Sequence, residues 1–143
     1  MMPSDEVLRS ILENGRTIAV VGLSDKPERE SNGVARYLIG QGYTIIPVNP
    51  AVPEVLGRTS YPSLDAIPTE IIVDIVDIFR HSDQVGPIVD ESLARGDAAI
   101  WMQTGIENAE AAARAQKAGV PVIQNACIMR THQRLHIPPK EKA

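Results

Sequence analysis

The sequence predicts an α/β domain, a Rossmann-like doubly wound sheet of about five parallel strands between two layers of helices. Short apolar runs alternate with stretches of helical apolar spacing, and glycines close several of those stretches. This alternation is typical of right-handed crossovers between parallel strands. The apolar runs end at Gly22, Val48-Asn49, Phe79-Arg80, Gln103-Thr104 and Asn125-Ala126, and most residues that can bind phosphate or react lie at or just after those ends. In an open parallel sheet such ends share one edge, the edge where ligands bind.

Length and composition limit the class of protein. The chain has 143 residues, 43% of them hydrophobic and 22% charged, which suits a single domain spanning residues 1–143. A net charge of −4 argues against broad binding to nucleic acid or to an anionic membrane, because both need basic surfaces. One cysteine excludes an internal disulfide framework. The three histidines lack the spacing of metal ligands, so we expect no metal site.

Nothing in the sequence indicates export or insertion into a membrane. No apolar run reaches the length of a membrane span. The first residues, MMPSDEVLRSILENG, are acidic and lack the basic region and apolar stretch of a signal peptide. We therefore expect a cytoplasmic protein.

The predicted elements follow one another in β-α order. An N-terminal helix within residues 1–16 is expected because apolar residues recur at helical spacing after Ser4. Strands are predicted at residues 17–21, 43–48, 74–79, 98–102 and 120–123. Further helices are predicted around residues 34–39, from Ser82 as N-cap through Leu93, and at 108–117.

The connection between the second and third strands is long and rich in proline. Residues 49–68 contain four prolines, so we expect an irregular segment with one helical turn at residues 63–67. Pro47 precedes this segment and cannot donate to a sheet, so it should lie at the very end of its strand or at a bulge. Residues 136–143 are expected to form a flexible tail.

The first loop, GLSDKPERESNGVA, carries the most chemistry. Gly22 permits a close approach of the backbone, and Ser31 with Asn32 can cap a helix whose N-terminus attracts phosphate. Lys26 and Arg29 add two positive charges at the same mouth. The loop therefore favours an anion-binding site, although a solvated turn with charges that keep it soluble remains the alternative.

The loop does not fit the dinucleotide fingerprint. In G-x-G-x-x-G the second glycine stands two positions after the first, where this chain has Ser24. An NAD site also uses an acidic residue at the end of the second strand, where this chain has Asn49. Asn49 can still bond a ribose, so an NAD(P)-binding redox or sensor protein stays open as an alternative.

Six segments in order resemble a known family. They are VGLSDKPERES, IIPVNP, YPSL, VDIVDIFR, WMQTGIEN and the segment around Cys127. Together they resemble the small CoA-binding domain proteins, which are similar to the N-terminal domain of the succinate–CoA ligase alpha subunit. The resemblance covers about residues 17–135. It implies a Rossmann-like fold and coenzyme A, or an acyl-CoA, as the ligand.

The resemblance also implies which residues contact the ligand. In that family the first loop wraps the CoA diphosphate, and the ends of later strands line the rest of the molecule. The positions that match the diphosphate loop are Gly22, Leu23, Ser24 and Lys26, with Arg29 and Ser31 nearby. Those beside the nucleotide are Val48, Asn49 and Pro50, and those along the adenosine or upper pantetheine are Phe79, Arg80 and Ser82. Gln103 opens a turn where the ligase domain has threonine, glutamate and glycine.

The charged residues at these positions fit the ligand that the resemblance implies. Lys26, Arg29 and Arg80 are the cations best placed to meet the phosphates of CoA. Arg80 either binds phosphate through two N–H groups or pairs with Asp83 at the surface. Phe79, the single phenylalanine, either stacks on adenine or belongs to the core.

Two other side chains need an explanation. Asp77 interrupts an apolar strand and is expected to accept backbone N–H bonds from a neighbouring loop, because a buried, unpaired carboxylate is costly. Cys127 is expected to be inert on a buried strand end, with a mixed disulfide to the CoA thiol as the alternative.

The resemblance favours binding over catalysis. The ligase family phosphorylates a histidine in a second domain and uses a partner subunit for nucleotide, and we expect neither here. The prediction is therefore a carrier, sensor or regulator of CoA or acyl-CoA, without catalytic residues, as a possible homodimer. An interaction module that acts in trans with a ligase-like partner remains a further alternative.

Overall fold

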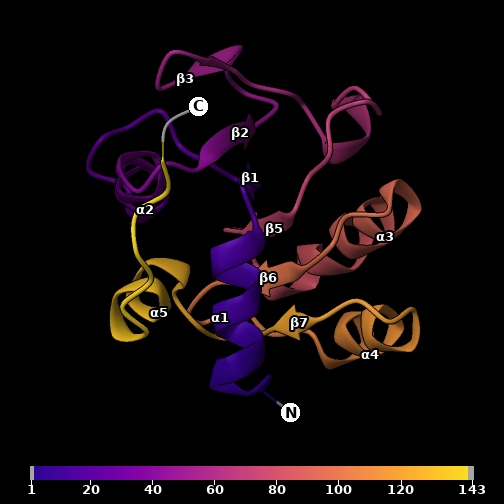
Figure 1. Cartoon of the computed structure of the whole chain (residues 1–143). Coiled ribbons are helices and arrows are strands. Elements are labelled where there is room, and N and C mark those ends of the chain that lie inside the picture. The colour runs from indigo at the N-terminus through magenta and orange to yellow at the C-terminus, as the bar shows by residue number, and fades with distance from the viewer. Residues whose placement is uncertain (1, 142–143) are drawn as a thin grey trace.

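The computed structural model describes residues 2–141 and contains the predicted parallel sheet. Its strands are β1 (Thr17–Val21), β2 (Thr44–Val48), β5 (Ile75–Ile78), β6 (Ile100–Met102) and β7 (Val122–Ile123). They lie in the order β2-β1-β5-β6-β7, and each neighbouring pair is parallel (Figure 1). The prediction of a five-stranded parallel sheet is therefore confirmed.

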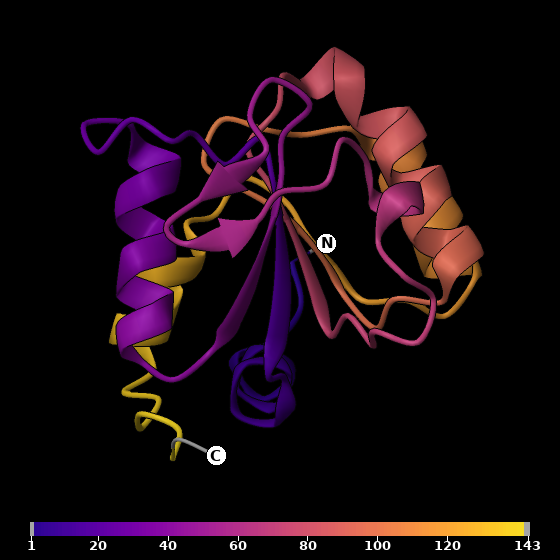
Figure 2. The same cartoon turned by 90° about the horizontal axis from the view of Figure 1, so that it is seen from above.

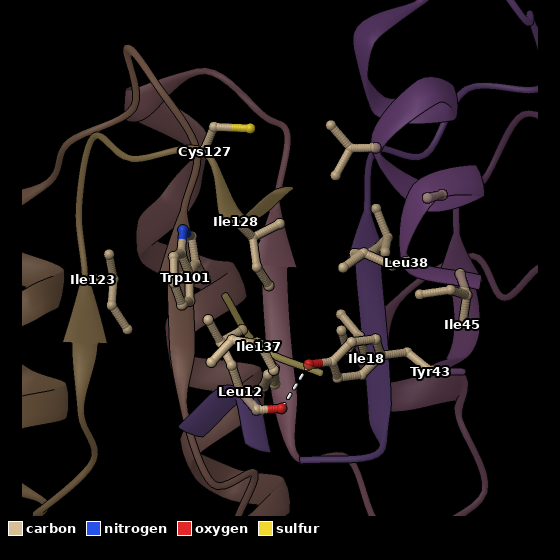
Figure 3. Packing of buried hydrophobic residues seen from close by; sticks show 14 of the residues in the cluster. Leu12, Ile18, Leu38, Tyr43, Ile45, Trp101, Ile123, Cys127, Ile128 and Ile137 are labelled. Atoms are coloured by element: carbon tan, nitrogen blue, oxygen red, sulfur yellow. Dashed lines mark hydrogen bonds between the residues drawn. The ribbon is translucent and has the colours of Figure 1, made fainter. Parts of the chain in front are cut away.

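Helices cover both faces of the sheet (Figure 2). The helices on one face are α1 (Asp5–Asn14), α2 (Glu30–Gly40) and α5 (Ile128–Arg134), and those on the other are α3 (Val85–Arg95) and α4 (Ala109–Lys117). Successive strand residues point to opposite faces, so Val20 and Trp101 join the first core while Ala19 and Ile100 join the second. Figure 3 shows the first core, where Trp101 and Ile18 of the strands meet Ile128 of α5.

The strand order reverses direction between β1 and β5. From β1 the chain crosses outward to β2 and then returns past β1 to β5. The register places Val21 of β1 beside Ile78 of β5, so the segments that follow them emerge next to each other. Such a switch point is the usual ligand position in an open parallel sheet.

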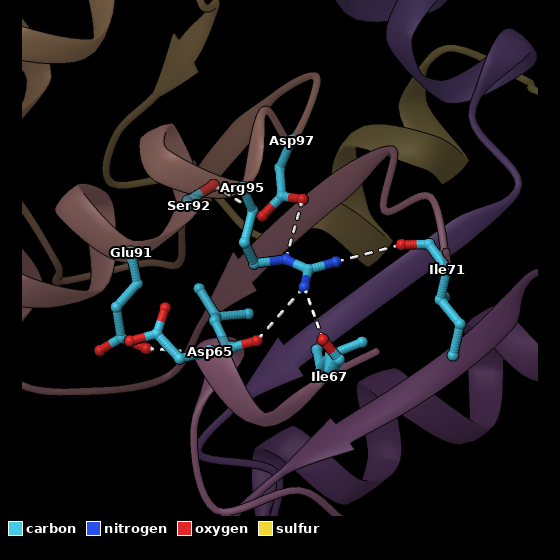
Figure 4. A network of polar contacts seen from close by, with 8 residues as sticks. Asp65, Ile67, Ile71, Glu91, Ser92, Arg95 and Asp97 are labelled. Atoms are coloured by element: carbon cyan, nitrogen blue, oxygen red, sulfur yellow. Dashed lines mark hydrogen bonds and ion pairs between the residues drawn. The ribbon is translucent and has the colours of Figure 1, made fainter. Parts of the chain in front are cut away.

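The proline-rich connection has more structure than we expected. It contains an antiparallel hairpin of β3 (Glu54–Val55) and β4 (Arg58–Thr59), followed by the short 3-10 helix η1 (Leu64–Ala66) where one helical turn was predicted. The buried guanidinium of Arg95 then fixes the last part of the connection. It donates to the carbonyl oxygens of Ile67 at 2.9 Å and Ile71 at 3.1 Å (Figure 4).

Pro47 lies inside β2, next to its last residue, so the prediction that it stands at the very end or at a bulge is wrong. β2 is an edge strand. The carbonyl of Val48 faces β1 and accepts from Gly22 N at 2.8 Å, whereas that of Pro47 faces outward and accepts from Tyr61 N at 3.0 Å. The missing N–H of Pro47 therefore points away from the sheet, where no ladder bond is lost.

The C-terminal part of the chain makes contacts with the rest of the domain. α5 precedes it as a helix that we did not predict. Ile137 is buried, and the backbone N–H of Lys140 donates to Gln41 O at 2.8 Å. Residues 142 and 143 of the expected tail lie outside the described residues. Within residues 2–141, no helix is both long and apolar enough to cross a membrane.

Candidate functional site

Gly22 closes β1 at the switch point, where the end of β5 passes very near. Its φ of +88° lies in the left-handed region, which favours glycine. A Cβ at this position would lie 2.5 Å from Phe79 O and 3.0 Å from Arg80 Cδ. Glycine is therefore required here by the neighbouring strand end, which brings the first loop and Arg80 together.

The first loop is held by hydrogen bonds to the start of α2. Ser24 N donates to Ser31 Oγ at 3.0 Å, and Asn32 Nδ2 donates to Ser24 O at 2.9 Å. α2 begins at Glu30, with Arg29 as an N-cap that makes no side-chain bond. The prediction that Ser31 and Asn32 cap this helix is therefore wrong, because both side chains bind the loop instead.

Two of the predicted ligand residues, Leu23 and Asn49, stabilise the fold through their side chains. Leu23 is fully buried, so its side chain belongs to the core. Asn49 Nδ2 donates to Leu23 O at 3.0 Å, and its Oδ1 accepts from Ala51 N at 2.8 Å. The amide of Asn49 thus fastens the first loop to the end of β2.

Three exposed cations surround this edge of the sheet. Lys26, Arg29 and Arg80 are exposed, and no carboxylate of residues 2–141 lies within 4.0 Å of their charged nitrogens. The alternative pair between Arg80 and Asp83 is therefore not formed. Unpaired cations at a strand edge are available for an anionic ligand.

Two clefts meet at Arg80. The larger, about 690 Å³, is lined by residues 79–84 and 103–106 together with Glu30. The smaller, about 170 Å³, lies at the ends of β1 and β2 and reaches Ile88 and Glu91 of α3. Arg80 lines both clefts, so a ligand that extends from one into the other must pass its side chain.

The predicted residues divide between these clefts and the loop. Those that line the larger cleft are Phe79, Arg80, Ser82 and Gln103, and those that line the smaller are Gly22, Val48, Pro50 and Arg80. Ser24, Lys26, Arg29 and Ser31 line neither and belong to the first loop. We did not predict His81 or Ile106 as lining residues, although both directly follow strand ends or turns that we had singled out.

Ser82 does not cap a helix, so that prediction is wrong. The short 3-10 helix η2 (Ser82–Gln84) precedes α3, which begins only at Val85. Ser82 Oγ accepts from Glu107 N at 3.0 Å, and Ser82 O accepts from Asn108 Nδ2 at 3.1 Å. These bonds join the two walls of the larger cleft.

Gln103 is buried at the floor of the turn that follows β6. Its Oε1 accepts from Ile128 N at 3.0 Å, while its Nε2 has no hydrogen-bond partner in the described part of the chain. Gly105, with φ of +85°, completes a tight turn in which Ile106 N donates to Gln103 O at 2.9 Å. Asn125, which follows β7, also holds the turn, because its Oδ1 accepts from Gly105 N at 2.7 Å.

The expectation for Asp77 is wrong. Asp77 is fully buried, and neither carboxyl oxygen has a hydrogen-bond partner among the described residues. Burial raises the pKa of Asp77 well above its ordinary value. Asp74 instead takes the expected role, because its Oδ2 accepts from Arg16 N at 2.8 Å and Thr17 N at 3.0 Å.

Cys127 and Phe79 both contact the same core. Cys127 is buried as the residue before α5, not on a strand, and Figure 3 shows it at one end of the core cluster. Phe79 is half-buried and packs against that cluster while lining the larger cleft.

No group of three or more metal-binding side chains occurs within residues 2–141.

The chain is similar to known proteins over most of its length. A family model described as a CoA binding domain matches residues 16–133. The uncharacterized protein YneT of Bacillus subtilis is 40% identical over 130 residues, which cover 91% of this chain and 95% of YneT. The solved structure of a hypothetical protein from Pyrococcus horikoshii OT3 is 40% identical, with a TM-score of 0.89 over 94% of this chain and 93% of that one.

A larger enzyme contains a similar domain. The structure of a dinucleotide-forming acetyl-coenzyme A synthetase 1 from Ca. Korarchaeum cryptofilum, in complex with phosphate and ADP, matches with a TM-score of 0.70 and 26% identity. The match covers 87% of this chain and 31% of the synthetase chain. Since the family model spans all five strands and the first loop, this chain belongs to the CoA binding domain family.

Proposed function

We propose that this protein binds coenzyme A or an acyl-CoA at the carboxyl edge of its sheet and acts as a carrier, sensor or regulator. The position of Arg80 carries this proposal. Its guanidinium is exposed, has no carboxylate partner within residues 2–141 and stands where the two clefts meet. A long ligand with phosphates near its middle fits such an arrangement, with the nucleotide on one side and the pantetheine arm on the other.

The exposed cations of the site can bind the phosphates of CoA. Near neutral pH the pyrophosphate and 3′-phosphate carry about four negative charges, and arginine is well suited to bind phosphate through paired N–H groups. Lys26 and Arg29 on the first loop add two more cations without partners in the described chain. The same loop also carries Asp25, Glu28 and Glu30, so the proposal depends on the three unpaired cations and not on a positive net charge of the loop.

The first loop and Asn49 weigh against NAD. Both polar groups of the Asn49 amide are engaged by backbone atoms, so the residue is not free to bond a ribose in this conformation. Ser24 occupies the position of the second glycine in the dinucleotide fingerprint. We therefore assign the site to CoA rather than to a nicotinamide cofactor.

Calorimetric titration tests the ligand. The purified protein is titrated at one fixed salt concentration with CoA, 3′-dephospho-CoA, NAD and NADP, because salt screens phosphate contacts. We expect CoA to bind and 3′-dephospho-CoA to bind more weakly. Binding of NAD or NADP alone would refute the assignment.

Substitutions at the cations test the site. Arg80→Ala and Lys26→Ala should each weaken CoA binding, by about tenfold for a charge-assisted bond to phosphate. Lys117→Ala, at the exposed end of α4, is the matched control and should leave the affinity unchanged. Equal affinities for the wild type and both site variants would show that the phosphates bind elsewhere.

A further inference from the structure

We propose that Gln103 donates a hydrogen bond through Nε2 to a carbonyl oxygen on the pantetheine arm of the ligand, either an amide or an acyl thioester. This inference rests on the proposed function, and it names the group that the larger cleft recognises. It makes Gln103 the residue that distinguishes a ligand with the arm from a nucleotide without it.

The side chain of Gln103 is held in one orientation by the protein. The backbone N–H donates to Ile78 O at 3.3 Å, and the backbone carbonyl accepts from Ile106 N at 2.9 Å. Oε1 accepts from Ile128 N at 3.0 Å, which identifies the other amide atom as the donor Nε2. The three bonds tie the residue to β5, to its own turn and to the start of α5.

The donor Nε2 is left without a partner in a buried position. Gln103 is only 2% exposed, and Nε2 bonds to no atom of the described residues. Buried polar atoms without partners are rare because they lose their bonds to water and gain nothing in return. Gln103 is also one of the residues that line the larger cleft, where a ligand can offer an acceptor.

A neutral carbonyl suits this donor better than a phosphate. The unpaired cations belong to the first loop and to Arg80, so the phosphates have stronger, charged donors there. Gln103 follows β6, which lies two strands from β1 in the sheet, or about 10 Å away at the usual strand spacing. In CoA, the acceptors at a distance from the phosphates are the ring nitrogens of adenine and, on the arm, a hydroxyl and the carbonyl oxygens; among them the carbonyls are the strong acceptors of the arm, and a ligand that keeps adenine but lacks the arm separates the two ends.

The test compares three ligands that share the same nucleotide. CoA, acetyl-CoA and adenosine 3′,5′-bisphosphate are titrated into wild type, Gln103→Met and Gln103→Glu, and each variant is first checked by thermal unfolding. Gln103→Glu keeps an acceptor for Ile128 N and removes the donor, while Gln103→Met removes both without adding charge. Gln133→Met, at an exposed position of α5, is the control.

The decisive quantity is the ratio of the affinity for each CoA ligand to the affinity for the bisphosphate. We expect the ratio for CoA to fall about tenfold in both Gln103 variants and to stay unchanged in Gln133→Met. A fall confined to acetyl-CoA would support the inference, with the thioester oxygen as the acceptor. Unchanged ratios in both Gln103 variants would overturn it. Failure of wild type to bind any of the three ligands would refute the proposed function, and this inference with it.

Discussion

Two buried polar regions of this protein differ in how completely their hydrogen bonds are formed. Around Arg95, the guanidinium binds Asp97 at 3.3 Å and three backbone carbonyls, and Ser92 Oγ donates to Asp97 at 3.0 Å (Figure 4). At the turn that follows β6, Gln103 keeps Nε2 without a partner in the described chain. The first region holds a connection in place. The second is where a ligand can supply what the protein does not.

The largest effect should come from breaking the complete network. Arg95→Ala removes the partner of Asp97, whose side chain is 3% exposed, and frees the carbonyls of the 64–71 segment. Removal of one member of a buried ion pair costs about 3–5 kcal/mol in the free energy of unfolding. Urea denaturation measures this loss.

The control for Arg95 is an exposed pair of the same type. Arg114 binds Asp90 at 3.0 Å with side chains 41% and 59% exposed. Arg114→Ala should cost about 0–1 kcal/mol, as is usual for surface ion pairs. If both variants lost the same stability, the network around Arg95 would not be what fixes the connection.

At Asp77 we expect a substitution to raise the free energy of unfolding, whereas Arg95→Ala lowers it. Asp77→Leu removes two buried oxygens that have no partner among residues 2–141, so the free energy of unfolding at pH 7 should rise by about 1–3 kcal/mol. Asp74→Leu is the matched variant, and it should lower stability because Arg16 N and Thr17 N lose their acceptor. A loss of stability in Asp77→Leu as large as that in Asp74→Leu would contradict this interpretation.

The same residue should make stability depend on pH. Burial raises the pKa of Asp77 above the ordinary 3.8, so the folded protein keeps a proton that the unfolded chain releases. The contribution of Asp77 to stability is therefore most favourable below pH 3.8 and is lost as pH rises toward the folded pKa. Asp77→Asn cannot ionise and should flatten this slope in denaturation curves measured from pH 4 upward.

The smallest effect is expected at His132. Burial, with a further contribution from the charge of Lys140, lowers the pKa of His132, and Nδ1 bonds the Tyr37 hydroxyl at 2.7 Å. The unfolded chain therefore binds a proton first, so stability falls as pH decreases below 6.5 toward the folded pKa. His132→Leu should reduce this slope, and an unchanged slope would assign it to other groups.

Local sequence patterns predicted the sheet well but not the polar partners. The five apolar runs are long enough to identify their strands, because burial on both faces leaves little polar sequence in them. The roles of Asp74 and Asp77 could not be separated, since the donors Arg16 N and Thr17 N lie almost sixty residues away in sequence and only the register brings them near.

The sequence predicted the edge of the sheet at which the site lies, but not the hydrogen bonds of several of its side chains. Residues at strand ends do gather at one edge, as the fold requires. Ser31, Asn32 and Ser82 are typical helix caps, but each side chain binds a loop segment 7 to 25 residues away in sequence instead of the start of its own helix. α5 has only three buried residues, two of them polar, so it lacks the apolar spacing that identifies a helix.

Pro47 also affects how the sheet meets other molecules. An edge strand normally offers free N–H and C=O groups to which another chain can add, which leads to aggregation or exchange of strands. At β2 the outward N–H is absent at Pro47, and its carbonyl is already occupied by Tyr61 N. Tyr61 O further covers the edge by accepting from Asn49 N at 2.9 Å. Addition of another strand is thereby hindered at the Pro47 end of β2, and the opposite edge, β7, offers a strand of two residues.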